Sequence, residues 1–500
     1  MGRAKEPSPQ RSITAGSDFL QLDIADAPPG GRADWLSAQL RQAIAGGRLP
    51  VGGRLPATRV LAADLGVSRG VVTEAYQRLV EDGQVAGRGR AGTVVVAAPA
   101  APPPPLRRAP AAATAPAALF PQAPGSDVFD AVRAVPARID LTPGLPDLAA
   151  FPRADWLRAE RAVLGRVAPA DFGYGDPCGA PALRRAVAGW LARSRGIAVD
   201  PTEVVVVAGV SQALGLLAQA LRADGITRIG VEDPGSLGVR QHLNNWGVDT
   251  PPVPVDGAGV CVDALAAAGL PAVLLTPAHQ FPTGVVLDGE RRRRLVAWAR
   301  DGGLVIEDDY DAEHRYDRPP VPALRGMLPD RICYAGSVSK LLAPALRVGW
   351  LLVPQRYRDA VVAAKRNADL GNAVLPQLVL AELMTSGALE RQLRLLRRRH
   401  VRRRDAMIAA LARHLPRATV HGAAAGLHLM VTLDADVPDT ELAAATLARG
   451  VKTQPLSWHC QRPYRPGLVL GYAANPASDI EQGIATVADA LSGLRRTRGS

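Results

Sequence analysis

A lysine follows a short apolar run in the sequence Ser337-Val338-Ser339-Lys340, and Arg347 stands seven residues after it. A lysine amine at the end of a strand can form a Schiff base with a carbonyl cofactor. A fixed arginine nearby can hold a phosphate with two parallel hydrogen bonds. Because any surface loop can contain Ser-x-Ser-Lys, this chemistry requires support from other parts of the chain.

A second polar cluster, Glu307-Asp308-Asp309-Tyr310-Asp311, ends an apolar run about thirty residues upstream. A carboxylate there can keep a pyridine nitrogen protonated, and a tyrosine hydroxyl can bond the 3-oxygen of the same ring. An acidic strand end can instead bind magnesium. No glycine-rich nucleotide loop of the Walker type accompanies this one, which favours the pyridine interpretation.

Two further segments fit the same chemistry. In Ala208-Gly209-Val210-Ser211 a strand gives way to a helix, where backbone amides and the Ser211 hydroxyl can cradle a phosphate. A plain strand-to-helix turn would look the same. The polar loop 276–284, which lies between prolines, can line a ring-binding pocket with His279, or His279 can simply be a surface residue.

The elements that would position these residues follow an alternating pattern. From Ile139 onward, short β-branched runs alternate with longer helical patterns, which predicts an α/β fold with a largely parallel sheet. The expected strands are 204–207, 228–231, 272–275, 304–306 and 332–334. After about Leu389 a very basic helix is followed by strand-like segments at 427–433 and 468–472, which predicts a small α+β subdomain.

The amino-terminal part reads as three helices and a β-ribbon. The pattern predicts a helix at about 59–65, a turn at Gly66 and Val67, and a second helix that Ser68 caps and that runs through Glu81. Such a second helix reads the DNA major groove with its first residues, and a following hairpin contacts phosphates. The candidate DNA-binding residues are Arg59, Ser68, Arg69, Gly70, Thr73, Arg88 and Arg90, and the opposite stripe, Val72, Ala75, Tyr76 and Leu79, is expected to be buried.

The charge balance favours an acidic partner. The chain of 500 residues carries a formal charge of +12, and residues 31–96 hold nine arginines against five acidic residues. A three-helix interaction module with a solvated arginine face is the alternative. The four cysteines form no C-x-x-C pair, so we expect neither a metal site nor disulfides. The amino terminus lacks an apolar signal core, and no apolar run is long and uninterrupted enough to cross a membrane, so we expect a cytoplasmic protein without a membrane partner.

Composition divides the chain into five parts. Residues 1–30 are expected to be a flexible arm and residues 31–96 the helix-turn-helix domain. An Ala/Pro-rich tract makes 97–135 a linker, because such a segment can bury little surface. Residues 136–490 form the large α/β domain, and 491–500 a basic tail.

The string from Gly47 to Leu79 resembles the DNA-binding domain of GntR-type regulators, a winged helix-turn-helix. Together with the segments around Ser211, His279, Asp308 and Lys340, in this order, the chain resembles the MocR subfamily of those regulators. The resemblance implies that the large domain has the fold of fold-type I aminotransferases, which depend on pyridoxal 5'-phosphate (PLP). It covers almost the whole chain outside the arm and the linker.

The resemblance also implies a role for each matching residue. Lys340 would form the Schiff base (aldimine) with PLP, Asp308 would pair with the pyridine nitrogen, and Tyr310 would contact the 3-oxygen. The phosphate would be held by Ser211, the amide of Val210 and Arg347, with Ser339 and His279 also at the cofactor. Tyr174 resembles a tyrosine that reaches the partner subunit's phosphate, which implies a homodimer with composite sites. Arg465 matches the arginine that binds an amino-acid carboxylate.

Two positions depart from the family pattern. Ser236 stands where an aromatic residue often covers the cofactor ring, which puts efficient transamination in doubt, and His314 stands where Phe is common. We therefore expect a regulator that binds double-stranded DNA and senses PLP, an amino acid or an amine through an aldimine. The alternatives are a working aminotransferase with an accessory DNA-binding domain, and an architectural DNA-binding protein whose enzyme domain is inactive. The basic helix 391–404 either tracks DNA or is a solvated face.

Overall fold

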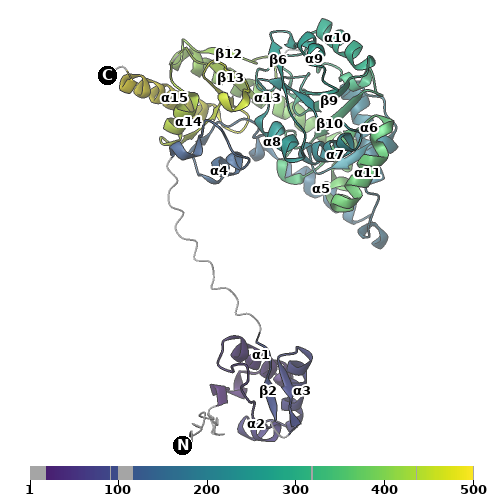
Figure 1. The fold of residues 1–500 in the computed structure, drawn as a ribbon, viewed down its shortest axis with the longest axis vertical. Coiled ribbons are helices and arrows are strands. Elements are labelled where there is room, and N and C mark those ends of the chain that lie inside the picture. Colours follow the sequence, from purple (N-terminus) through teal and green to yellow (C-terminus); the bar gives the residue numbers. More distant parts are fainter. Residues whose placement is uncertain (1–18, 90–91, 99–115, 317–318, 435, 499–500) are drawn as a thin grey trace, which may run out of the picture. The chain divides into compact units, whose positions relative to one another are not determined.

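The computed structural model describes residues 19–89, 92–98, 116–316, 319–434 and 436–498. The chain forms two compact units, residues 1–112 and 113–500 (Figure 1). Among the described residues, no helix has both the length and the apolar character needed to cross a membrane. The prediction for the middle of the Ala/Pro linker, 99–115, lies outside the described residues.

The amino-terminal unit is a winged helix-turn-helix, as the sequence predicts. Its elements are α1 (Arg32–Ala45), α2 (Thr58–Asp64), α3 (Arg69–Glu81), β1 (Val85–Gly87) and β2 (Thr93–Val95). The two strands pair antiparallel, with Val85 opposite Val95. As expected from its apolar stripe, α3 buries Val72, Ala75, Tyr76 and Leu79.

The packing of this unit begins earlier than the arm prediction allows. Two short 3-10 turns, η1 (Phe19–Gln21) and η2 (Ile24–Asp26), precede α1. Leu20 and Leu22 pack against the core of the domain, so residues 19–30 are part of it. The composition of the segment conceals these two leucines among polar residues. The rest of the expected arm, 1–18, lies outside the described residues.

The large unit is built on an eight-stranded sheet in the order β4-β11-β10-β9-β8-β5-β6-β7. The strands are β4 (Val205–Val207), β5 (Ile229–Asp233), β6 (Pro252–Asp256), β7 (Gly259–Val260), β8 (Ala272–Leu275), β9 (Leu304–Asp309), β10 (Ile332–Ser337) and β11 (Gly349–Leu352). The pairs among β6, β5, β8, β9 and β10 are parallel, whereas β11 is antiparallel to both β10 and β4. The largely parallel sheet is confirmed, and the carboxyl ends of β4, β9 and β10 meet at one edge.

Helices cover both faces of this sheet (Figure 1). They are α5 (Arg153–Leu164), α6 (Pro181–Arg195), α7 (Val210–Ala223), α8 (Leu237–Asn245), α9 (Val262–Ala267), α10 (Gly289–Arg300), α11 (Gln355–Asp369) and α12 (Val374–Thr385). Alternate residues of β4 serve the two faces: Val205 and Val207 pack with α7 and α11, and Val206 packs with α6 and α12. A strand buried on both faces explains the continuous valine run.

A smaller α+β subdomain completes the large unit, as predicted. Its antiparallel sheet has the order β12-β13-β16-β15. The strands are β12 (Thr419–His421), β13 (His428–Thr432), β15 (Gln454–Pro455) and β16 (Gly467–Gly471), a separate pair joins β14 (Val451–Lys452) to β3 (Ile139–Asp140), and the helices are α13 (Ala388–His414), α14 (Asp439–Leu447) and α15 (Ala477–Arg498).

The structure corrects two boundaries of this unit. The sequence assigns residues 97–135 to the linker, but η4 (Pro116–Leu119) and α4 (Val128–Ala134) already pack on the small subdomain. Phe120 stacks on Trp458 with ring centroids 5.5 Å apart. The composition of the segment predicts a linker because alanines and prolines outnumber these few apolar side chains. The expected basic tail from residue 491 is, through Arg498, the last part of α15, in which Leu491 is buried.

Candidate functional site

Lys340 lies just beyond the carboxyl end of β10, on the edge where the parallel strands end. Its side chain is partly buried, and Nζ donates a hydrogen bond to the carbonyl oxygen of Gly144. Burial lowers the pKa of Lys340, while the carboxylates of Asp311 and Asp308 oppose that shift. A lowered pKa makes the neutral amine more available, and the neutral amine is the nucleophilic form.

Gly144 is a site residue that the sequence analysis missed. Its φ is +85°, and a Cβ at this position would lie 3.1 Å from Nζ of Lys340. Glycine is therefore required both by the backbone and by the close approach of the lysine. Gly144 and Lys340 are 196 residues apart, so no local sequence pattern connects them.

Asp308 lies one strand away from the lysine segment, because β9 and β10 are parallel neighbours with Asp308 opposite Ala335. The carboxylate is buried, and its Oδ1 has no hydrogen-bond partner. Burial, and then the nearby Asp309 and Asp311, raise the pKa of Asp308 to about 7. An orphaned buried acceptor is costly unless a donor arrives, so Oδ1 fits the N–H of a protonated ring nitrogen.

The neighbouring Asp309 has a different role. It receives hydrogen bonds from Arg195 Nε and Tyr334 Oη, both at 2.5 Å, in a fully buried group. Successive side chains of a strand point to opposite faces, which separates Asp309 from Asp308. The strand end therefore does not present these two carboxylates together to a magnesium ion, and Asp309 anchors β9.

The raised pKa of Asp308 predicts a pH dependence of stability in the cofactor-free protein. Below about pH 7 the folded carboxyl keeps a proton that the unfolded chain releases from about pH 4 upward. The free energy of unfolding should therefore fall as pH rises toward 7, by about 1.4 kcal/mol per pH unit for each such group. The carboxyls whose pKa burial raises to about 7 are Glu232, Glu307, Asp308 and Glu313.

Asp308→Asn should remove the contribution of this one carboxyl to the fall in the free energy of unfolding with rising pH. Urea unfolding between about pH 5 and 7 should show a shallower loss of stability in the variant than in the parent protein. Asp301→Asn is the matched control, since Asp301 is exposed at the end of α10. Equal slopes for the parent and Asp308→Asn would contradict the prediction.

Tyr310 and His279 meet beside Asp308 and Lys340. Nδ1 of His279 lies 3.0 Å from Oη of Tyr310 and 2.9 Å from Oδ2 of Asp311. His279 is 1% exposed, so the surface alternative is wrong and the polar loop does line the site. Burial, and then the charges of Asp311 and Asp308, raise the pKa of Tyr310 well above its ordinary value, so its hydroxyl keeps its proton.

His279, Asp311 and His428 have the spacing of a metal-binding group. One ligand atom from each lies within 4.8 Å of the others, and all three residues are buried. Hydrogen bonds already engage the group, however, since Nδ1 of His279 faces Asp311 and Nε2 of His428 lies 3.2 Å from the carbonyl oxygen of Pro282. These bonds explain the arrangement without an ion.

The start of α7 forms a cradle suited to a phosphate. Gly209 precedes the helix with a φ of +85°, and Val210 and Ser211 supply its first amides, which have no partners within the helix. The Arg347 guanidinium donates to the carbonyl oxygen of Ala208 and would lie 3.3 Å from a Cβ on Gly209. A helix start and an adjacent arginine are the groups that bind phosphate, as predicted. Ser339 lies partly buried at the adjoining turn.

A polar network that the sequence analysis missed adjoins the cradle and contains the buried Lys365. Oε1 of Gln212 accepts from the amide of Ala208 at 2.7 Å, and its Nε2 donates to Asp369 at 2.7 Å. The fully buried Lys365 donates to Asp369 at 2.9 Å and to Asn372 at 2.7 Å. These residues come from α7, α11 and the following turn, so only the packing of the helices brings them together.

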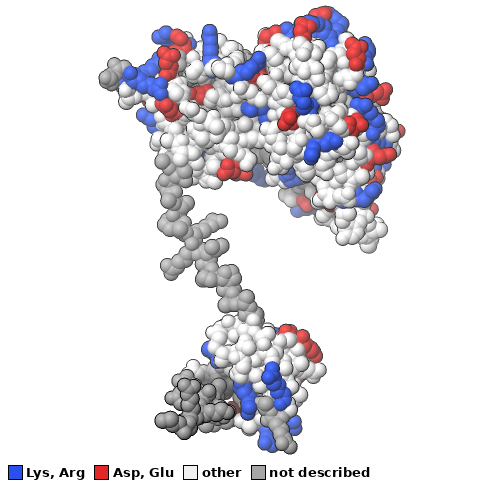
Figure 2. Space-filling view, viewed as in Figure 1, with Lys and Arg blue, Asp and Glu red and all other residues white. Residues whose placement is uncertain are grey.

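The recognition end of the amino-terminal unit is accessible. The described candidates are all exposed: Arg59, Ser68, Arg69, Gly70, Thr73 and Arg88. Ser68 occupies the cap position of α3, but its side chain makes no capping hydrogen bond, unlike the prediction. Figure 2 shows Lys and Arg side chains over the lower part of this unit and acidic side chains near its upper edge. Arg90 lies outside the described residues.

Comparison with known proteins matches both units. Residues 33–95 match the family "Bacterial regulatory proteins, gntR family", and residues 139–466 match "Aminotransferase class I and II". The chain is 32% identical over 463 residues to the probable rhizopine catabolism regulatory protein MocR of Rhizobium meliloti, covering 92% of this chain and 93% of that protein. The chain belongs to the MocR-type regulators of the GntR family.

Other relatives agree with this assignment. The pyridoxine biosynthesis transcriptional regulator PdxR of Corynebacterium glutamicum is 32% identical, over 91% of this chain and 95% of its own. Among solved structures, the multiple substrate aminotransferase of Thermococcus profundus superposes with a TM-score of 0.68 at 25% identity, over 75% of this chain and 96% of its own. The kynurenine aminotransferase of Pyrococcus horikoshii gives 0.67 at 25% identity, over 74% and 94%. The large unit of this MocR-type regulator thus has the fold-type I aminotransferase fold.

Both family departures have a local explanation in this MocR-type regulator. Ser236 caps α8, since its Oγ accepts a hydrogen bond from the amide of Val239 at 3.3 Å. His314 is buried, stacks edge-on against His400 with centroids 5.0 Å apart, and places Nε2 3.3 Å from the carbonyl oxygen of Lys340. His314 therefore contacts the backbone of the central lysine segment and does more than fill the place of a phenylalanine.

Two other predicted residues lie apart from the Lys340 cluster. Tyr174 is 94% exposed. Arg465 is exposed on the loop before β16, and that loop is tied to the end of β5 through Arg462, whose Nε donates to Asp233 at 2.8 Å. No contact within the described residues joins either side chain to Lys340.

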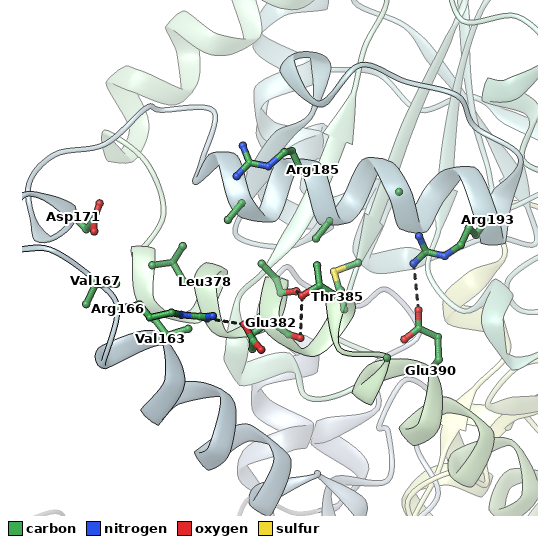
Figure 3. A pocket seen from close by; sticks show the side chains of 16 residues that line it. Val163, Arg166, Val167, Asp171, Arg185, Arg193, Leu378, Glu382, Thr385 and Glu390 are labelled. Carbon is green, nitrogen blue, oxygen red and sulfur yellow. Dashed lines mark hydrogen bonds and ion pairs between the residues drawn. The ribbon is translucent and has the colours of Figure 1, made fainter.

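A separate cavity of about 800 Å³ lies between α5, α6, α12 and the start of α13 (Figure 3). Two ion pairs lie along its wall, Arg166–Glu382 at 2.6 Å and Arg193–Glu390 at 3.4 Å. None of the residues that line it belongs to the Lys340 cluster or to the cradle at α7. The cavity is therefore distinct from the cofactor-type site of this MocR-type regulator.

Proposed function

We propose that this protein is a cytoplasmic transcriptional regulator that binds double-stranded DNA and PLP. Its aminotransferase-like unit senses PLP, an amino acid or an amine, and DNA affinity changes in response. The observation that carries this proposal is the meeting of Lys340, the orphaned carboxylate of Asp308 and the arginine-flanked cradle at α7 on one edge of the sheet. A ligand shifts DNA affinity only if it binds one state of the protein better than the other.

The residues of this edge fit PLP. When bound, PLP supplies a carbonyl group that reacts with amines and a ring that takes up electrons. Lys340 would hold the carbonyl carbon, Asp308 would accept the pyridine N–H, and Tyr310 would donate to the 3-oxygen. Val210, Ser211, Ser339 and Arg347 would hold the phosphate, and His279 would line the ring pocket.

The proposal also assigns a role to each of two exposed residues, Tyr174 and Arg465. Tyr174 is too exposed to serve its own subunit as it stands, and we assign it to the phosphate of a partner subunit in a homodimer. Arg465 would bind the carboxylate of an amino-acid effector. Its loop is joined to Asp233 at the end of β5, just before the position where the ring would be covered.

The test follows absorbance and DNA binding on the same preparation. Titration of the purified protein with PLP should produce a visible band, and mobility shifts on its own promoter DNA should change when PLP or an amine is added. No visible band, or a band without any change in DNA affinity, would contradict the proposal. Analytical ultracentrifugation of the same sample tests the homodimer.

An active aminotransferase is the second candidate, since the solved structures with this fold include aminotransferases of 25% identity. Ser236 argues against efficient turnover because it offers no aromatic cover for a ring. An assay with keto acids as amino acceptors separates the two functions. Robust turnover together with no specific DNA binding would favour the enzyme.

The basic helix α13 contains two sets of arginines that differ in their surroundings. Arg399 and Arg403 both pair with the buried carboxylate of Asp147 at 2.9 Å, although the Arg399 side chain is 41% exposed. Arg394, Arg398 and Arg402 follow one another at intervals of four residues and are exposed. The first set is engaged with Asp147, whereas the second set is exposed and has no ion pair among the described residues.

Replacing Arg394, Arg398 and Arg402 together by glutamine tests that second set. If they track DNA, the slope of log affinity against log salt should become shallower by about 0.9 for each phosphate that the protein no longer neutralises. If they are a solvated face, the slope should stay unchanged, which is the result we expect. Arg153→Gln, an exposed arginine of α5, is the control for a change in net charge.

A further inference from the structure

We propose that Asp311 and His279 are positioning residues that keep the Tyr310 proton available for the 3-oxygen of the cofactor. This inference rests on the proposed binding of PLP. Asp311 holds a hydrogen on Nδ1 of His279, and that hydrogen in turn weakens the Asp311 carboxylate as an acceptor for the tyrosine hydroxyl. Neither residue then draws the Tyr310 proton away from the cofactor side of the site.

The geometry centres on a single nitrogen atom. Nδ1 of His279 lies within hydrogen-bond distance of both Oδ2 of Asp311, at 2.9 Å, and Oη of Tyr310, at 3.0 Å. A ring nitrogen carries either one hydrogen or one lone pair. It can therefore donate to the carboxylate or accept from the hydroxyl, but it cannot do both.

Asp311 decides between these two states. An ionised carboxylate only accepts hydrogen bonds, so it requires a hydrogen on Nδ1. Nδ1 then has no lone pair for Tyr310, and its hydrogen engages the Asp311 carboxylate, which becomes a weaker acceptor for the Tyr310 hydroxyl. In aspartate–histidine pairs of this kind, the carboxylate selects the tautomer of the ring.

The other edge of the His279 ring supports the neutral form. Nε2 is buried without a hydrogen-bond partner. The ring is packed against Gly426 and Gly284, since a Cβ on Gly426 would lie 2.0 Å from Cε1 and one on Gly284 would lie 3.1 Å from Nε2. A charged ring would place an N–H donor there without an acceptor in a dry environment, which is costly.

Several charged groups surround Tyr310 and Lys340, and they also affect the quantity that the test measures. Asp311, Asp308 and Glu232 face Tyr310, and Asp311, Asp308 and Arg133 face Lys340. A change at Asp311 thus alters the charge near the lysine as well as the hydrogen bonds of His279. For this reason the informative quantity is the effect of Tyr310→Phe measured separately in each background.

The experiment measures the pH midpoint of the visible absorbance of the PLP-loaded protein. A hydroxyl that donates to the 3-oxygen stabilises negative charge there, so Tyr310→Phe should raise the midpoint by about one pH unit in the parent protein. In His279→Phe, Asp311 loses its Nδ1 donor and becomes a stronger acceptor for the Tyr310 proton. In Asp311→Leu, Nδ1 becomes free to accept it. In both backgrounds Tyr310→Phe should shift the midpoint by less than about 0.3 units.

The possible results separate the two proposals. A visible band with a full Tyr310→Phe shift in all three backgrounds would overturn the role of His279 and Asp311 and leave PLP binding intact. No visible band in the parent protein would overturn PLP binding and this inference with it. A stoichiometric change of the spectrum with added Zn²⁺ that His428→Phe abolishes would assign the group to a metal and overturn the inference.

A second measurement observes the His279 ring directly in the parent protein. The ring of His279 in the parent protein should show ¹⁵N shifts of a hydrogen on Nδ1 and a bare Nε2, in a protein with eight histidines labelled. Comparison with His279→Phe assigns the signals. A bare Nδ1 would overturn the inference.

Discussion

Lys340→Ala should abolish the visible absorbance that PLP produces with this protein and the response of DNA binding to PLP. The amine of Lys340 approaches Gly144 near Asp308, and desolvation lowers its pKa, which favours the reactive neutral form. Alanine leaves the cradle at α7 in place, so the variant should still bind PLP weakly through its phosphate. The measurement is an absorbance titration followed by dialysis, which should remove all PLP from the variant.

The lysine content of the chain allows a direct chemical check. The sequence contains four lysines, Lys5, Lys340, Lys365 and Lys452. Reduction of the PLP-loaded protein with borohydride, followed by digestion and mass spectrometry, should find the added mass on the peptide with Lys340. Lys365 is engaged with Asp369 and Asn372, and Lys452 with Asp140, so we expect neither to be labelled.

Lys452→Arg is the matched control for this prediction. Lys452 lies in β14, and its Nζ is 3.4 Å from Oδ2 of Asp140, an ion pair that arginine can keep. The control should retain the visible band. Labelling of Lys365 at the level of Lys340, or a full band in Lys340→Ala, would contradict the assignment of the central lysine.

Arg69→Ala should weaken specific DNA binding by about 10-fold to 100-fold, the range of one good arginine contact to a base. Arg69 is the first residue of α3, is exposed, and has its Nε 3.4 Å from Oγ1 of Thr58 at the start of α2. The start of the second helix is the part of a helix-turn-helix that enters the major groove. Fluorescence anisotropy with promoter DNA and with unrelated DNA measures the specific and the non-specific affinity.

Arg41→Ala is the control for the loss of one positive charge from the same unit. Arg41 lies on α1 and pairs with Asp82 at 2.6 Å, both partly exposed, so its loss should change stability by less than about 1 kcal/mol. Arg69→Ala should reduce specific binding much more than Arg41→Ala does. An equal loss for the two variants would show that Arg69 acts only through net charge.

Much of the fold could be predicted from local patterns. The stripe of Val72, Ala75, Tyr76 and Leu79 recurs at helical spacing, and α3 buries these four residues. Short runs of β-branched residues predict β4, β8, β9 and β10, because such strands are buried on both faces. The strands of the large sheet that were missed, β6, β7 and β11, contain proline, glycine or tryptophan, which blur the pattern. Leu20 and Phe120 were missed because each is an isolated apolar residue in a segment of biased composition.

The sequence by itself determined which residues stand at the carboxyl ends of the strands. Lys340, Asp308, Tyr310, Ser211 and Arg347 were found because each follows a recognisable apolar run or helix start, and parallel strands end at one edge. The order of these segments along the chain also determined the family. These features can be recognised in short stretches of sequence because they depend on residues that are close together along the chain.

Only the tertiary structure decided what the neighbouring side chains do around Lys340 and Arg347. It separated Asp308, whose Oδ1 has no partner, from Asp309, which Arg195 and Tyr334 hold. It brought Gly144 to Lys340 across 196 residues and turned His279 from a loop residue into a partner of Tyr310 and Asp311. Such interactions depend on the packing of distant elements against one another, and the strength of a buried charge or hydrogen bond depends on that packing rather than on sequence spacing.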